Sequence, residues 1–165
     1  MLLSSIQLAA YLKCGDHIKL KWSKSMSTIH PQLLNDSHVL GYFPLCHLLL
    51  ENDASYPWFI LVPKRENISE IYQLSAADQQ QLMLESSALG EGLMAALKGD
   101  KLNVAALGNI VPQLHVHVIV RYKTDAAWPG PVWGKRPAKE YDELELIQLK
   151  DKFKQLALPN FTSIG

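Results

Sequence analysis

The sequence lacks the features that mark several large classes of protein. Its 165 residues include only two cysteines, and its acidic and basic residues number 16 each, so the formal net charge is zero. The two thiols, Cys14 and Cys46, do not suggest a disulfide framework, and we expect a reducing, cytoplasmic environment. The balanced charge gives no electrostatic reason to expect nucleic acid or a membrane surface as a partner. No apolar run approaches the length of a membrane span, which is about 20 residues.

The length and the terminal residues suggest one main domain with an extension at each end. A chain of 165 residues is typical of a single domain with an ordinary core. Residues 1–26 begin with an apolar stretch and continue with scattered lysines, but they lack the basic leader and the cleavage site of a signal peptide. We expect residues 1–26 to form an N-terminal extension, 27–138 the main domain, and 139–165 a C-terminal helix and tail.

Periodicity and turn residues predict an α+β fold. Five apolar or alternating runs bounded by turn residues are typical of strands. Ser75 and Asp78 form a capping-box signature at the start of one long helix, whose leucines recur at near-helical spacing. Strands clustered around one long helix favour an antiparallel sheet of about five strands. The predicted strands are 39–43, 46–50, 58–62, 102–107 and 113–121, and the predicted helices are 32–34, 76–98 and 141–156.

The fifth predicted strand, Gln-Leu-His-Val-His-Val-Ile-Val-Arg at 113–121, is the most informative segment of the chain. Side chains alternate between the two faces of a strand. One face is therefore wholly apolar, with Leu114, Val116, Val118 and Val120. The other face carries Gln113, His115, His117, Ile119 and Arg121, with neighbours roughly 6–7 Å apart. Two imidazoles on one face of a rigid element indicate a functional site.

Three interpretations of His115 and His117 are open. They could be ordinary polar residues on the solvated face of a half-buried strand. They could be two ligands of a metal ion, which would need further ligands. The sequence has no Cys-x-x-Cys motif and no histidine after His117, so His47 or Cys46 could join them only through the fold.

The third interpretation is nucleophilic catalysis at phosphorus. A neutral imidazole attacks well when its second ring nitrogen donates to a fixed acceptor. The charge that develops on a phosphoryl group requires several hydrogen-bond donors. The amides of Gln113, Asn103 and Asn109 can donate without adding charge. His117 can hold a phosphoryl oxygen or protonate a leaving group.

These residues resemble the histidine triad (HIT) family. The similarity lies in the run from Asn103 through Gly108-Asn109-Ile110-Val111-Pro112-Gln113-Leu114-His115-Val116-His117-Val118-Ile119. HIT proteins bind nucleotides and transfer or hydrolyse nucleoside monophosphate through a nucleotidyl-histidine intermediate. Their substrates include dinucleoside polyphosphates such as diadenosine polyphosphate, nucleoside phosphoramidates and acyl nucleotides. The resemblance points to the hydrolase-like and phosphoramidase-like branches.

The resemblance implies a role for each matched residue. His115 corresponds to the nucleophilic middle histidine and His117 to the last one, whereas Gln113 occupies the place of the first. In the family the main-chain carbonyl of that first position orients the nucleophile, and a main-chain role survives any side chain. Asn103 matches an amide that contacts the phosphate, and Asn109 matches a small polar residue after the turn glycine.

The resemblance extends over about residues 30–135. Leu48–Asp53 and Phe59–Lys64 look like the family's strand, acidic turn and second strand, so that Asp53 or Asn52 would hold the ribose hydroxyls. Residues 128–131, Trp-Pro-Gly-Pro, resemble a tail that one branch places near the active site. The family also implies a HIT-like fold, a homodimer built partly around the long helix, and no metal or other cofactor held by the protein.

The sequence leaves two alternatives to a HIT-type hydrolase or transferase. One is a non-catalytic nucleotide sensor, because the first triad histidine is replaced by Gln113. The other is a small metalloprotein that uses His115 and His117. Among the other residues, Arg121 is expected to be a solvated cap of the sheet, and Cys46 a buried small residue. Trp58 and Trp133 could stack on a base or pack, and His17, His30, His38 and His47 are interpreted as structural.

Overall fold

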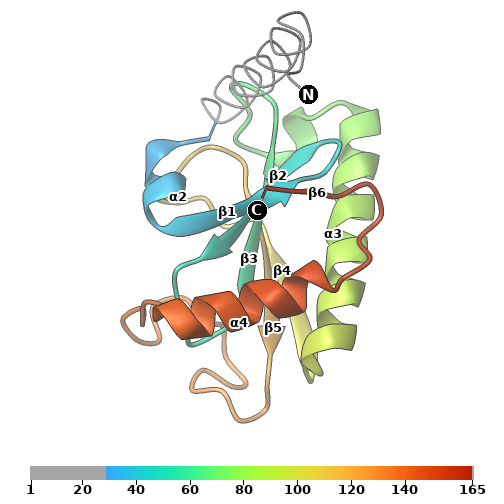
Figure 1. Cartoon of the computed structure of the whole chain (residues 1–165). Helices are drawn as coiled ribbons and strands as arrows, with labels where there is room; N and C mark the ends of the chain where they lie inside the picture. Colours follow the sequence, from blue (N-terminus) through green and yellow to red (C-terminus); the bar gives the residue numbers. More distant parts are fainter. Residues whose placement is uncertain (1–28, 165) are drawn as a thin grey trace, which may run out of the picture.

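The computed structural model describes residues 29–164, which form a six-stranded antiparallel sheet with helices on its surface (Figure 1). The strand order is β4-β5-β3-β2-β1-β6. The elements in chain order are α2 (Pro31–Asn35), β1 (Ser37–Tyr42), β2 (Cys46–Glu51), β3 (Trp58–Pro63), the 3₁₀ helix η1 (Ile71–Gln73), α3 (Ala76–Leu97), β4 (Lys101–Ala105), β5 (Val116–Arg121), α4 (Glu143–Lys154) and β6 (Thr162–Ser163).

The predicted α+β class and the five predicted strands are confirmed. The sheet gains a sixth strand, because the C-terminal β6 pairs with β1 through Gly41 and Tyr42. The predicted strand 113–121 begins only at Val116, so His115 lies just before it. The predicted N-terminal extension, residues 1–26, lies outside the described residues. Within residues 29–164 no helix is both long and apolar enough to cross a membrane.

The two faces of the sheet carry separate hydrophobic clusters, as strand alternation requires. On one face, Leu114, Val116, Val118 and Val120 pack with Leu89 and Leu93 of α3 and with Phe153 of α4. On the other face, Ile60 and Ile119 pack with Ile29, Trp58 and Val132. The apolar side of the histidine strand therefore faces the helices. Its histidine side faces the second cluster.

Helix α3 begins and ends where the local sequence predicts. The Ser75 hydroxyl accepts a hydrogen bond from the Asp78 amide at 3.1 Å, which satisfies a donor of the first turn. The helix ends at Leu97, and its C-cap residue Lys98 adopts the left-handed conformation with φ of 55°. At the next residue, a Cβ on Gly99 would lie 2.3 Å from Val120, so only glycine lets the chain turn this close to β5.

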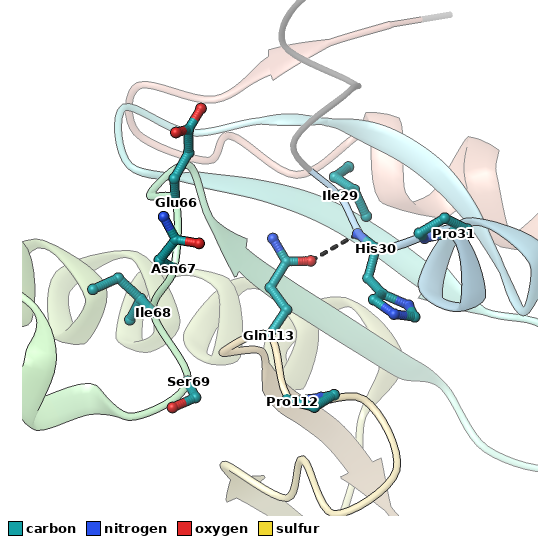
Figure 2. Close-up of a pocket in the computed structure, with 9 residues that line it drawn as sticks. All are labelled: Ile29, His30, Pro31, Glu66, Asn67, Ile68, Ser69, Pro112 and Gln113. Atoms are coloured by element: carbon teal, nitrogen blue, oxygen red, sulfur yellow. Dashed lines mark hydrogen bonds between the residues drawn. The ribbon is translucent and has the colours of Figure 1, made fainter.

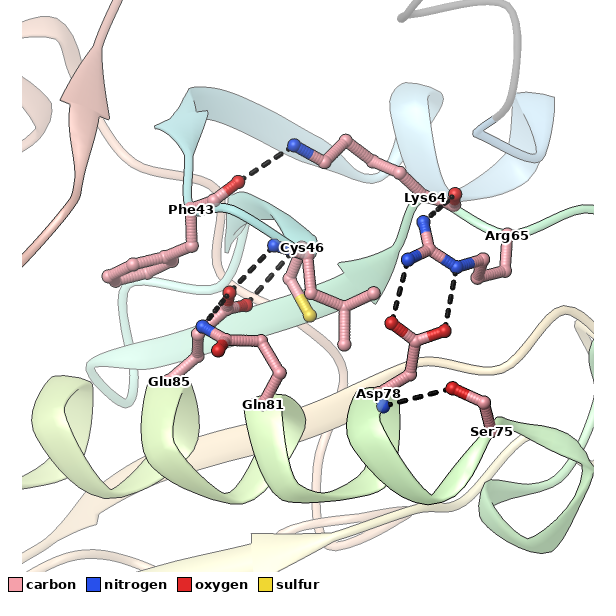
Figure 3. A network of polar contacts seen from close by, with 9 residues as sticks. Phe43, Cys46, Lys64, Arg65, Ser75, Asp78, Gln81 and Glu85 are labelled. Carbon is pink, nitrogen blue, oxygen red and sulfur yellow. Dashed lines mark hydrogen bonds and ion pairs between the residues drawn. The ribbon is translucent and has the colours of Figure 1, made fainter.

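A network of polar contacts ties α3 to the sheet (Figure 3). The buried Glu85 carboxylate accepts the backbone amides of Leu45 and Cys46 at 2.7 and 2.9 Å. Arg65, just after β3, makes two hydrogen bonds to Asp78 in the first turn of α3. Burial raises the pKa of the Cys46 thiol, and the neighbouring Glu85 charge adds to this. The contact between Arg65 and Asp78 fixes the path of the chain as it leaves β3 toward residues 66–69.

Candidate active site

His115 and His117 lie against each other in a buried site. Their ring centroids are 4.8 Å apart and their planes are nearly perpendicular, at 82°. The two residues are 5% and 6% exposed. His117 pairs with Ile60 on β3 and with Ala105 on β4, so it lies on an internal strand rather than on a solvated edge. This burial argues against the interpretation of an ordinary solvated face.

The imidazole of His115 is oriented by the main chain two residues earlier. Its Nδ1 lies 2.7 Å from the carbonyl oxygen of Gln113. A carbonyl can only accept, so Nδ1 must carry the hydrogen. In the neutral ring the lone pair is then on Nε2. The backbone of the preceding loop closes on the same ring, because a Cβ on Gly108 would lie 3.5 Å from Cε1 of His115.

His117 is held in the opposite tautomer. The indole Nε1–H of Trp58 donates to Nδ1 of His117 at 2.9 Å. Because an indole cannot accept in its plane, Nε2 of His117 carries the hydrogen, and it faces the Leu107 carbonyl at 3.4 Å. Burial, and then the charge of His115, lowers the pKa of His117 to about 4. The ring is therefore neutral at physiological pH and acts as a donor.

Two tryptophans surround His117. Trp58 is 8% exposed, and Trp133 packs edge-on against both Trp58 and His117 with centroid distances of 5.3 Å. Of the two roles considered for Trp58, the structure shows packing together with the hydrogen bond to the imidazole. No sequence pattern links Trp58 to His117, since the pair forms only when β3 aligns with β5.

Both carbonyl oxygens of Gln113 contact other residues, and Figure 2 shows the contact that its side chain makes with His30. The main-chain oxygen holds His115, and the side-chain Oε1 accepts the backbone amide of His30 at 2.7 Å. His30, interpreted as structural from the sequence, thus stands beside the triad position. The sequence offers no signal for this contact, because the two residues are 83 positions apart.

Two adjoining cavities lie next to these residues. The smaller one, about 200 Å³, is lined by His115, Gly108, Asn109 and Gln113 among others. The larger one, about 610 Å³, lies between residues 29–31 and 66–69. The structure therefore places His115, Gln113 and Asn109 around one cavity.

Asn103 is tied to Arg121 on the same face of the sheet. Its Oδ1 accepts from Nη1 of Arg121 at 2.7 Å, which leaves the amide NH₂ as the group that Asn103 can present. Arg121 is only 1% exposed and also pairs with Asp125, at 2.7 Å. The expectation of a solvated Arg121 is wrong, because the chain after β5 folds back and brings Asp125 and the Gly130 carbonyl onto the guanidinium.

Asn52 and Asp53 lie beyond the end of β2 and line neither of the two cavities. Asp53 accepts the backbone amides of Ser55 and Lys139, at 2.9 and 3.2 Å. Asn52 accepts the amide of Tyr141 at 3.2 Å. Both side chains thus anchor the segment that leads into α4. Their expected contact with a ribose stays a prediction.

The described residues contain no group of three or more His, Cys, Asp or Glu side chains placed to hold a metal ion. The ring nitrogens of His115 and His117 that are used within the fold face the Gln113 carbonyl, the Trp58 indole and, at 3.4 Å, the Leu107 carbonyl. The arrangement instead offers one imidazole lone pair, on His115, and one imidazole N–H, on the adjacent ring of His117 4.8 Å away. Such a pair suits attack on a phosphoryl group together with donation to its oxygens.

Comparison with known proteins identifies the family. The HIT domain family model matches residues 32–124. The fold is similar to a histidine triad protein from Marinobacter aquaeolei VT8, with 54% identity, a TM-score of 0.75, and coverage of 78% of this chain and 97% of that chain. A histidine triad protein from Bradyrhizobium japonicum is 44% identical, with a TM-score of 0.76 and coverage of 78% and 96%. No curated protein matches the sequence.

A third structure, a histidine triad protein from Sinorhizobium meliloti 1021, is 41% identical, with a TM-score of 0.76 and coverage of 78% of this chain and 96% of that chain. This chain belongs to the HIT domain family, the histidine triad proteins. The predicted family is thereby confirmed, and it is one of nucleotide-binding proteins, whereas the branch within the family stays a prediction.

Proposed function

We propose that this protein transfers or hydrolyses a nucleoside 5′-monophosphoryl group through a covalent intermediate on His115. The observation that carries the proposal is the hydrogen bond between Nδ1 of His115 and the Gln113 carbonyl, at 2.7 Å beside an open cavity. It directs the Nε2 lone pair away from the backbone. It also stabilises the positive charge that the ring acquires when Nε2 bonds to phosphorus.

The reaction has two steps. Nε2 of His115 attacks the phosphorus while the bond from phosphorus to the leaving group breaks, and the leaving group takes up a proton. Water, or another acceptor, then attacks the phosphorus, loses a proton, and releases the nucleotide as the bond to Nε2 breaks. When substrate binds, the neutral His117 shifts its Nε2–H from the Leu107 carbonyl to a phosphoryl oxygen, and the amides of Asn109 and Gln113 donate from the cavity wall. Asn103 presents an NH₂ group from β4.

The decisive experiment is rapid quenching with adenosine 5′-phosphoramidate, followed by denaturing mass spectrometry. We expect a mass increase of one adenylyl group on the peptide that contains His115, and no such increase in His115→Asn. His38→Asn is a matched control for the adduct, because His38 lines neither of the two cavities beside His115. Turnover that persists unchanged in His115→Asn would refute the nucleophile assignment.

A nucleotide sensor without turnover is the second candidate, and Gln113 in place of the first triad histidine favours it. Equilibrium dialysis with AMP and GMP, run beside the adduct experiment, separates the two. Binding without any cleavage of a phosphoramidate or a dinucleoside polyphosphate would favour the sensor.

We also propose that the protein is a homodimer, as the family resemblance implies. Strand β4 lies at the edge of the sheet, and apolar side chains near it and on α3 are exposed. These are Met83, Leu84, Val104, Leu107 and Ile110. Exposed apolar side chains that gather near a sheet edge are typical of interaction surfaces. Sedimentation velocity at micromolar concentration should give a dimer that Val104→Glu weakens, whereas a monomer in the wild type would contradict the proposal. A cytoplasmic location also stays a prediction.

A further inference from the structure

A larger cavity continues from the one that contains His115. It has a volume of about 610 Å³, and Ser69, Pro112 and Gln113 line both cavities. Ligand pockets in proteins commonly measure about 300–1,000 Å³. A substituent on a phosphorus atom held at His115 can therefore extend past Gln113 into a space of suitable size.

Gln113 links the wall of the larger cavity to the nucleophile. In Figure 2 its side chain reaches toward residues 29–31, while residues 66–69 lie on its other side. Oε1 of Gln113 accepts the backbone amide of His30 at 2.7 Å, and its main-chain oxygen accepts from Nδ1 of His115 at the same distance. A histidine at position 113 has no side-chain carbonyl oxygen with which to accept the backbone amide of His30. The replacement of the first triad histidine thus has a structural consequence.

The opposite wall is fixed by contacts outside the cavity. Asn67 adopts the left-handed conformation with φ of 57°, which asparagine tolerates better than most residues. Two residues earlier, Arg65 forms an ion pair with Asp78, and Lys64 donates to the Phe43 carbonyl at 2.7 Å. The two cations nearest this wall in sequence are therefore engaged elsewhere.

The lining of the larger cavity suits an uncharged organic group. Among its described residues, four are apolar and four offer an amide, a hydroxyl or an imidazole. The remaining one is Glu66, and no lysine or arginine is among them. A chain of phosphates in proteins is bound chiefly by cationic side chains and amide donors. Beside Glu66 it would meet a like charge instead.

From the joined cavities and the two contacts of Gln113, we propose that the larger cavity is a substrate subsite that Gln113 shapes. It receives an uncharged organic substituent of the reacting phosphate, either the nucleoside or the leaving group, rather than a chain of further phosphates. The inference rests on the proposed function, because that function places the reacting phosphorus at His115.

Calorimetric binding to the His115→Asn variant tests the subsite without turnover. The probes are adenosine 5′-phosphoramidate, its N-benzyl derivative and ADP. A gain of about tenfold in affinity from the benzyl group identifies the leaving group as the occupant. The same measurement with guanosine and uridine 5′-phosphoramidates identifies the nucleoside as the occupant, if affinity changes with the base. A tenfold gain from the second phosphate of ADP would overturn the proposal, as would a series in which neither base nor benzyl group matters.

Substitutions at position 113 test its role in the same background. Gln113→Met removes Oε1 and keeps the length of the side chain, and it should remove the gain that the benzyl group or the preferred base provides. Gln113→Glu keeps an acceptor oxygen and should restore that gain. Gln80→Met, on the exposed side of α3, is the matched control. Equal selectivity in Gln113→Met and the wild type would overturn the assignment to Gln113. Failure of the proposed function would appear separately, as the absence of an adduct on His115 while these affinities still differ.

Discussion

The buried ion pair between Arg121 and Asp125 provides a quantitative test of the structure. Their side chains are 2% and 6% exposed and lie 2.7 Å apart. The guanidinium also donates to Asn103 and to the Gly130 carbonyl, at 2.7 and 3.0 Å. The hydrogen bond from Arg121 lowers the pKa of Asp125. We therefore expect Arg121→Met to leave an uncompensated carboxylate inside the protein.

Removing one partner of a buried ion pair costs about 3–5 kcal/mol. Here Asp125 keeps hydrogen bonds from the backbone amides of Tyr122 and Ala127, at 3.2 and 3.0 Å. These bonds hold part of the charge, so we expect the lower end of that range, about 3 kcal/mol. The double variant Arg121→Met/Asp125→Asn removes the unpaired charge. It should be more stable than Arg121→Met alone.

Urea unfolding followed by circular dichroism measures each free energy of unfolding. Lys123→Met is the matched control, because Lys123 is 71% exposed in side chain and lies 3.9 Å from Asp100. An exposed pair of this kind contributes about 0–1 kcal/mol. If Arg121→Met lost no more than Lys123→Met, Arg121 would be solvated, and the reasoning from its burial would be refuted.

Three further predictions concern the histidine site. Unfolded histidine has a pKa near 6.5 and His117 has one of about 4, so the unfolded state binds more protons between these values. The contribution of neutral His117 to the free energy of unfolding should thus be fully present above about pH 6.5 and be lost, by up to about 3 kcal/mol, as the pH drops to 4. Urea titrations at several pH values measure this dependence, and His117→Asn should flatten it. Trp58→Phe removes the donor to Nδ1 of His117 and should cost about 1–3 kcal/mol; ¹⁵N NMR of the ring should show a changed tautomer, and an unchanged spectrum would contradict the contact. Gly108→Ala would place a Cβ 2.9 Å from the Val111 carbonyl, so adduct formation should slow by about tenfold or more while thermal stability changes little; equal rates would show that the loop adjusts.

Sequence reasoning succeeded where a rule acts over a few residues. Alternation along 113–121 correctly separated the apolar face from the face with His115 and His117, because successive strand side chains point to opposite sides. The start of α3 was also predicted correctly, because the Ser75 cap bonds to Asp78 only three residues later. The helix bounds were predicted to within about two residues, since helices start and stop through nearby side chains.

The same reasoning failed for Arg121, and it did not find Glu85. A strand-end arginine and a helical glutamate are solvated in most sequences, so their types gave no warning of burial. Each is buried because a distant segment supplies its partners: the chain after β5 for Arg121, and the turn between β1 and β2 for Glu85. These partners come close only when the connecting loops fold back onto the sheet, which the local sequence does not reveal.

The amino-acid order alone determined the family and the antiparallel sheet, and the family resemblance implied the contact between the Gln113 carbonyl and His115 that the structure shows. Only the tertiary structure decided which tautomer His117 adopts and what Gln113 holds with its side chain. Those choices come from Trp58, 59 positions away, and from His30, 83 positions away. Strand register and the return of the chain bring such residues together, and neither is encoded in any short stretch of sequence.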